Sequence, residues 1–284
     1  MQFVEAHERK SSLYYNCSNY IIGSKKINNP TIPITVSEQI ESTRMCYDAG
    51  ASLVHLHVRN EDESPSSDVN KFKELLAGIK ESCPNMIIQF STGGRGRSHE
   101  ERGAMLYLKP DMASLATGSV NFPTSIYENH PSLINELAQS MLKYSIKPEI
   151  EIFDLAMLYN AIEMVKDGLL LEPIHVQFVF GIRNALPAKK NILEFQISEL
   201  KKFLPQSTWT AAGLGKSQLI VNEWSLELGG HCRTGLEDNI KYDKTRLANG
   251  NEELVERLAL LSKKFHRPVA SPTEAREILG LGQV

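Results

Sequence analysis

The chain lacks a strong excess of charge of either sign, a long apolar run and any segment rich in proline or glycine. Its 284 residues hold 31 Lys and Arg against 34 Asp and Glu, a formal net charge of −3, which argues against a nucleic-acid partner. With 42% hydrophobic residues, 13 prolines and 18 glycines, it is neither disordered nor collagen-like. No apolar stretch approaches the roughly 20 residues that span a bilayer. The N-terminal stretch has no signal-peptide core, so we expect a cytoplasmic protein without a membrane partner.

Cysteine is also scarce, and the cysteines form no CxxC pair. The four are Cys17, Cys46, Cys83 and Cys232. Their wide spacing is less typical of a disulfide framework than of isolated buried thiols in a reducing compartment.

Short apolar or β-branched runs alternate with segments of helical period about every 35 residues, which is the rhythm of βα units. The candidate strands are Leu13–Cys17, Ser52–Val58, Met86–Ser91, Met112–Ala116, Pro148–Phe153, His175–Phe180, Thr208–Ala212 and Gly230–Gly235. Nothing resembling a linker divides the chain. Residues 1–284 are therefore expected to form one α/β domain, a single (β/α)8 TIM barrel, with residues 1–12 as an N-terminal extension and residues 270–284 as a C-terminal helix. A doubly wound open sheet is the alternative, but no GxGxxG follows the first strand.

The best-marked helix begins after Thr35. Thr35 and Glu38 form a T-x-x-E capping box, and Gly50 can end the helix in the left-handed conformation.

Polar and apolar residues alternate within several of the predicted strands. In the run LVHLHVR at 53–59, the apolar side chains share one face, while the two histidines and the arginine share the other. Residues 149–152, 175–180 and 231–237 alternate in the same way. A parallel sheet covered by helices on both faces has nearly continuous apolar strands instead. The alternation therefore favours a barrel with a polar interior near its mouth.

A metal site is the chemistry that this polar face most directly suggests. His55 and His57 lie two residues apart, so one cation can bridge their imidazoles at the C-terminal end of a barrel strand. Glu237, just past the eighth strand, can supply a third ligand, since the first, second and eighth strands lie close together around a closed barrel. Two histidines and a carboxylate suit catalytic Zn²⁺ and also Fe²⁺. The alternative is a pair of hydrogen-bonded core histidines.

Candidate acid–base groups stand beside these ligands in the sequence. Asp238 follows Glu237, and Arg233 precedes it by four positions, so a carboxylate near a metal and a guanidinium could remove a proton from a carbon acid. A structural Arg–Asp ion pair is the alternative. Glu149 and Glu151 share the inward face of the fifth strand, and Glu151, nearer the mouth, is a candidate active-site group.

Two glycine-containing stretches at strand ends are candidate anion sites. They are Ser91-Thr92-Gly93-Gly94, which could bind a carboxylate, and Gly213-Leu214-Gly215-Lys216, which could bind the phosphate of a cofactor such as coenzyme A. Either stretch could also be an ordinary turn.

Four motifs resemble the β-keto acid cleavage enzymes, the group that includes 3-keto-5-aminohexanoate cleavage enzyme. They are HLHVR at 55–59, STGG at 91–94, KPDMASL at 109–115 and GLEDN at 235–239. The resemblance runs in order from IPIT at 32–35 to RPVASP at 267–272 and AREIL at 275–279, so it covers nearly the whole chain. It implies a (β/α)8 barrel, usually a homotetramer, with one divalent metal, normally zinc, in each subunit.

The resemblance also implies a reaction. In this family a β-keto acid and acetyl-CoA are converted by a reversible Claisen-type exchange into acetoacetate and the CoA thioester of the remaining acyl group. The metal ligands would be His55, His57 and Glu237.

Further residue roles follow from the same resemblance. Asp238 would take the C2 proton, with Arg233 and Ser91 orienting it and the substrate carboxylate. Gly94 and Ser114 would add substrate contacts, and Glu151 an active-site hydrogen bond.

The sequence departs from the amine-using member of this family in two places. The first strand and its loop, residues 13–26, contain no acidic residue suited to an ammonium group and include Lys25 and Lys26. We therefore expect a substrate with a neutral or anionic tail. The segment Gly181–Pro187 also differs from the expected glycine-rich loop, which leaves the CoA contacts open.

Two other hypotheses about the function remain at this point. A metal-dependent hydrolase or aldolase without CoA is one, because two histidines and a carboxylate can also activate water. A barrel that only binds a metal or a ligand is the other, although simple binding needs no base such as Asp238.

Overall fold

The barrel is closed. The computed structural model describes residues 15–18, 25–94 and 97–282. Parallel strands are joined in the order β1-β12-β11-β10-β9-β6-β5-β2, and β2 pairs again with β1. The strands are β1 (Tyr15–Ser18), β2 (Leu53–Leu56), β5 (Ile87–Phe90), β6 (Met112–Ala116), β9 (Lys147–Ile152), β10 (His175–Phe180), β11 (Thr208–Gly213) and β12 (His231–Thr234). The predicted TIM barrel is confirmed, and each predicted run overlaps one barrel strand.

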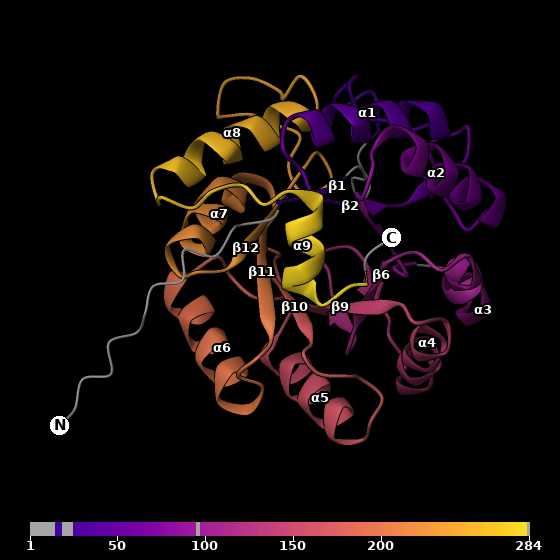
Figure 1. Cartoon of the computed structure of the whole chain (residues 1–284), viewed down its shortest axis with the longest axis vertical. Coiled ribbons are helices and arrows are strands. Elements are labelled where there is room, and N and C mark those ends of the chain that lie inside the picture. Colours follow the sequence, from indigo (N-terminus) through magenta and orange to yellow (C-terminus); the bar gives the residue numbers. More distant parts are fainter. Residues whose placement is uncertain (1–14, 19–24, 95–96, 283–284) are drawn as a thin grey trace.

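Helices surround the strands on the outside, except α9 (Pro272–Leu279), which lies over one end of the barrel (Figure 1). They are α1 (Val36–Asp48), α2 (Val69–Ser82), α3 (His99–Gly103), α4 (Pro131–Tyr144), α5 (Leu155–Lys166), α6 (Lys190–Phe203), α7 (Gln218–Glu227), α8 (Asn251–Lys263) and α9 (Pro272–Leu279), with the 3₁₀ turns η1 (Ala104–Leu108) and η2 (Gly215–Ser217). Val54 and Leu56 of β2 belong to the same buried apolar cluster as Leu75 of α2. The apolar strand face therefore meets the helices, and the polar face is left for the interior.

The predicted start of α1 is confirmed. The Thr35 hydroxyl accepts the Glu38 N–H at 3.2 Å, and the Glu38 carboxylate accepts the Thr35 N–H at 2.9 Å. Gly50 follows the helix with φ +103°, a conformation that glycine adopts without strain.

Two short antiparallel hairpins extend from the barrel and were not predicted. One joins β3 (Val58–Arg59) to β4 (Pro65–Ser66), and the other joins β7 (Val120–Asn121) to β8 (Ile126–Tyr127). The first hairpin shortens the predicted strand Ser52–Val58, because pairing between β2 and β5 ends at Leu56 and Phe90. His57 therefore lies between the barrel strand and the hairpin.

Helix α9 covers the end of the barrel at which the strands begin (Figure 1). Ala275 and Leu279 form a buried apolar cluster with Leu53, Ile87 and Met112, which lie at or near the starts of three strands. The helix is shorter than the predicted segment 270–284 and is followed by Gly280 at φ +66°. The predicted N-terminal extension, 1–12, lies outside the described residues.

The cysteines behave as expected where the structure describes them. Cys46, Cys83 and Cys232 are buried and have free thiols, whereas the side chain of Cys17 lies outside the described part. Within that part, no helix combines the length and the apolar character needed to cross a lipid bilayer.

Candidate active site

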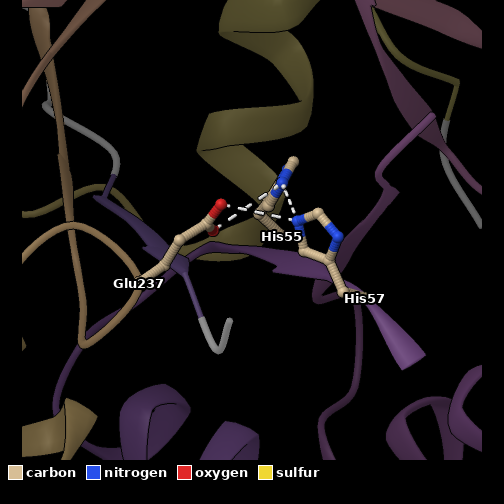
Figure 2. Close-up of side chains that lie close together, drawn as sticks. All are labelled: His55, His57 and Glu237. Atoms are coloured by element: carbon tan, nitrogen blue, oxygen red, sulfur yellow. Dashed lines mark hydrogen bonds and ion pairs between the residues drawn. The ribbon is translucent and has the colours of Figure 1, made fainter. Parts of the chain in front are cut away.

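Three predicted metal ligands converge at the C-terminal end of the barrel strands. Figure 2 shows His55 from β2, His57 directly after it, and Glu237 from the loop after β12 pointing toward one another. The two histidine Nε2 atoms lie 3.1 Å apart, and Glu237 oxygens lie 3.8 Å from His55 Nε2 and 3.4 Å from His57 Nε2. All three side chains are buried. Their ligand atoms fall within 4.8 Å of one another, so a single cation can contact all of them.

The orientation of His55 is fixed from the neighbouring strand. Gln89 of β5 is paired with His55 in the barrel register, and its side-chain oxygen accepts a hydrogen bond from His55 Nδ1. This bond leaves the lone pair of His55 on Nε2, where the other ligands meet. Burial lowers the pKa of His55 to about 4, so the ring is neutral near pH 7 and able to bind a metal.

Arg233 joins both carboxylates of the Glu237-Asp238 pair. Its Nε and Nη2 bind the two Asp238 oxygens at 3.0 Å each, and Nη2 also lies 2.9 Å from Glu237. Its Nη1 is buried without a hydrogen-bond partner among the residues described. The arginine therefore holds Asp238 beside the metal ligands and retains the N–H groups of Nη1 as donors for another anion.

Asp238 has the properties of a base in this setting. Burial raises the pKa of Asp238 to about 6, even though Arg233 acts in the opposite direction, and Glu237 adds to the rise. A carboxylate with this pKa is still mostly ionised at pH 7 and is a stronger base than an ordinary aspartate.

Two glutamates of β9 lie on the same face at different depths. Glu151 borders the cavity at the barrel mouth, and burial raises its pKa to about 8. Glu149 is completely buried below it, with one oxygen 3.5 Å from His175 Nε2. Glu151 is thus largely protonated at neutral pH and can donate a hydrogen bond.

The cavity over the metal ligands has a volume of about 540 Å³, which includes the open space at its mouth. Its walls include His55, His57, Ser91, Gly93, Gly94, Glu151 and Glu237, together with Pro65, Arg97, Phe122, Tyr127 and Phe153. The sequence did not predict the last five of these residues as part of the site. Most of them come from the two hairpins and from a loop, not from strand ends. Gln89 was also missed, although the alternation Ile87, Gln89, Ser91 could have placed it inside the barrel.

The STGG segment forms part of the cavity wall. The Ser91 hydroxyl accepts the Gly93 N–H at 3.1 Å, and a Cβ at Gly94 would lie only 2.8 Å from Cγ of Arg102. Ser114 lies behind this segment: it is fully buried, and its hydroxyl accepts the Thr92 N–H at 3.2 Å. Direct contact between Ser114 and substrate therefore stays a prediction.

Known proteins resemble this chain in sequence and in fold. The chain is 54% identical over 257 residues to 3-oxoadipate:acetyl-CoA acetyltransferase of Cupriavidus necator, covering 90% of both chains. It is 41% identical over 260 residues to 3-keto-5-aminohexanoate cleavage enzyme of Acetoanaerobium sticklandii, covering 91% of this chain and 94% of that one. The solved structure of ObcA superposes with a TM-score of 0.82 at 22% identity, over 89% of this chain and 66% of that longer one, which supports the fold. Residues 21–281 match the family profile described as beta-keto acid cleavage enzyme, and the chain belongs to this family.

Proposed function

We propose that this protein catalyses a metal-dependent exchange between a β-keto acid and acetyl-CoA, which yields acetoacetate and a new acyl-CoA. The observation that carries the proposal is the ion pair of Arg233 with Asp238 directly beside the buried His55, His57 and Glu237. Acetyl-CoA is a substrate in the printed name of the relative that is 54% identical. A base held next to a Lewis-acid site is suited to forming a carbanion at C2 of a β-keto acid.

His55, His57 and Glu237 would hold the cation, and their donor set suits Zn²⁺. The fit rests on the Gln89 contact, which frees Nε2 of His55 as a ligand atom. A divalent cation bound there supplies Lewis acidity that polarises the β-keto oxygen and makes the C2 proton more acidic.

The remaining steps are assigned to the chain's own side chains. Asp238 takes the C2 proton while Arg233 holds its two oxygens in place. The Ser91 hydroxyl and the Gly94 backbone, which border the cavity, orient the substrate carboxylate together with the uncommitted Nη1 of Arg233. The resulting carbanion attacks the thioester carbonyl of acetyl-CoA, and the C–S bond breaks to release CoA thiolate. The thiolate then attacks the former ketone carbon, and the bond between that carbon and C2 breaks to give the new acyl-CoA. The acetoacetate carbanion that is left takes the proton back from Asp238.

Glu151 and Ser114 have supporting roles in this scheme. Protonated Glu151 donates a hydrogen bond to a substrate oxygen from the cavity wall. Ser114 acts through the Thr92 backbone and positions the segment that carries Ser91.

The substrate tail is proposed to be anionic. Arg97 lies in the cavity wall and gives it a cation. Lys26 is bound by Glu38 instead, and neither Lys25 nor Lys26 borders this cavity. Because 3-oxoadipate carries a second carboxylate, the substrate of the C. necator relative is the first candidate.

The direct test incubates the metal-analysed protein with acetyl-CoA and a panel of β-keto acids that includes 3-oxoadipate and 3-keto-5-aminohexanoate. Acetoacetate and new acyl-CoA should form together from an anionic member, and only when acetyl-CoA is present. Cleavage of a panel member without CoA would instead support a metal-dependent hydrolase or aldolase. We also propose that the protein is a homotetramer, as the family resemblance implies, and light scattering after size exclusion tests this in the same preparation.

A further inference from the structure

Another cavity, of about 1200 Å³ including the open space at its mouth, lies beside the loops that follow β11 and β12. The loop after β11 contributes Lys216, the loop after β12 contributes Lys241 and Lys244, and α8 contributes Arg257. These loops follow the C-terminal ends of their strands, so the cavity lies on the face of the barrel that carries the metal ligands.

Hydrogen bonds connect this cavity to the catalytic loop. The Gly215 N–H donates to the Asp238 carbonyl at 2.7 Å, and the Gln218 side chain donates to the Gly235 carbonyl at 2.9 Å. Arg257 in turn donates to Gln218 at 3.1 Å. Lys216 therefore follows a residue that is bonded directly to the backbone of the proposed base.

The cavity wall carries a concentration of uncompensated positive charge. Lys216, Lys241 and Lys244 are exposed, and none of them forms an ion pair with a carboxylate in the described ranges. One carboxylate, Asp243, lies in the wall, and it already accepts the N–H groups of Thr245 and Arg246 and the Thr245 hydroxyl.

This charge distribution contrasts with the rest of the molecule. Four cations face one carboxylate in the wall, whereas the chain as a whole has a net charge of −3. Like charges gathered around an open cavity repel one another, and a polyanion that binds between them relieves the repulsion and gains charge-assisted hydrogen bonds.

We propose that this cavity binds the phosphorylated nucleotide end of acetyl-CoA, its 3′-phosphate and diphosphate, while the pantetheine arm carries the thioester to Asp238. The inference rests on the proposed function, because acetyl-CoA is the co-substrate there. Lys241 and Lys244 bind the phosphates from the rim, and Arg257 does so from the half-buried wall.

The first test measures binding of adenosine 3′,5′-bisphosphate to the metal-loaded protein by calorimetry. In the double variant Lys241→Ala/Lys244→Ala the dissociation constant should rise about tenfold or more, because two charge-assisted contacts are lost. The control variant Lys80→Ala/Lys263→Ala removes the same charge from exposed positions in the last turns of α2 and α8, and it should bind as the wild type does. AMP should bind more weakly than the bisphosphate, whereas equal binding would indicate a general nucleotide site and would count against the proposal.

The second test uses turnover. The double variant should raise KM for acetyl-CoA, leave KM for the β-keto acid unchanged, and match the wild type when S-acetylpantetheine replaces acetyl-CoA. If the wild type turns over acetyl-CoA but the variant shows neither weaker binding nor a raised KM, this inference is wrong and the proposed function stands. A different outcome is that the wild type shows no CoA-dependent turnover, although it binds the bisphosphate and the double variant does not. In that case the nucleotide site is supported and the proposed function fails.

Discussion

The side-chain oxygen of Gln89 accepts the Nδ1–H of His55 from the adjacent barrel strand. The other end of this amide, Nε2, has no hydrogen-bond partner among the described residues. A buried amide is costly to leave half satisfied, so the bond to His55 accounts for its presence at this position. Gln89 thus determines which imidazole nitrogen faces Glu237, although it lies outside the ligand group itself.

Replacing Gln89 with leucine should weaken metal binding while keeping the barrel folded. Without the acceptor, His55 is free to rotate or to change tautomer, and losses of this kind weaken metal sites about 10- to 100-fold. Competition with a chromogenic chelator measures the affinity. Gln196→Leu is the matched control, since Gln196 is also buried with an unpaired amide but lies on α6. Equal affinity in Gln89→Leu and wild type would show that His55 needs no such partner.

Glu237→Gln should lower the bound metal well below one ion per chain. The substitution keeps the size of the side chain but removes the negative charge that compensates a divalent cation. Elemental analysis after dialysis, together with the rise in melting temperature on adding Zn²⁺, measures the loss. His266→Asn is a control at an exposed position outside the site. Full metal occupancy in Glu237→Gln would remove this carboxylate from the ligand set.

Asp238→Asn should retain the metal but lose proton removal by about 100- to 10,000-fold, the usual contribution of a general base. Exchange of the substrate C2 proton with deuterium oxide, followed by NMR without acetyl-CoA, isolates this step from the later ones. Asp48→Asn changes an exposed carboxylate that pairs with Arg44 and should leave the exchange rate unchanged. Rapid exchange in Asp238→Asn would assign the base elsewhere.

The metal-free protein should lose stability between about pH 4.5 and pH 8 because of Glu151. Burial raises the pKa of this carboxyl to about 8 in the folded state, from 4.5 as the ordinary value. Between these values the unfolded chain releases the proton while the folded chain retains it, so the free energy of unfolding falls as pH rises. Glu151→Gln removes this penalty. The free energy of unfolding of the variant minus that of the wild type should therefore be larger at pH 8 than at pH 5, as measured by urea titration. A difference between the two proteins that does not change with pH would contradict the assignment.

The sequence predicted those parts of the site that lie on barrel strands or shortly after their C-terminal ends. Alternation along β2 and β12 placed His55 and Arg233 inside the barrel, because side-chain parity in a strand depends on local sequence alone. The end of α1 just before Gly50 could also be predicted, because it depends only on neighbouring residues. Arg97 and Tyr127 could not be placed in this way, since their positions depend on hairpins and loops whose path is determined by distant contacts. Contacts of this distant kind include those of Arg102, which donates hydrogen bonds to the side chain of Asn129 and to the Thr92 carbonyl.

The position of α9 has a consequence for how the protein is made. Leu53, Ile87 and Met112 leave the ribosome long before Ala275 and Leu279, which cover them in the finished molecule. Until residues 272–279 emerge, the underside of the nascent barrel presents these apolar side chains to water, where a chaperone can hold them. A ribosome that stalls before Pro272 would release a chain that has every metal ligand but lacks α9. Quality-control proteases could recognise such a chain by the apolar patch that α9 normally covers.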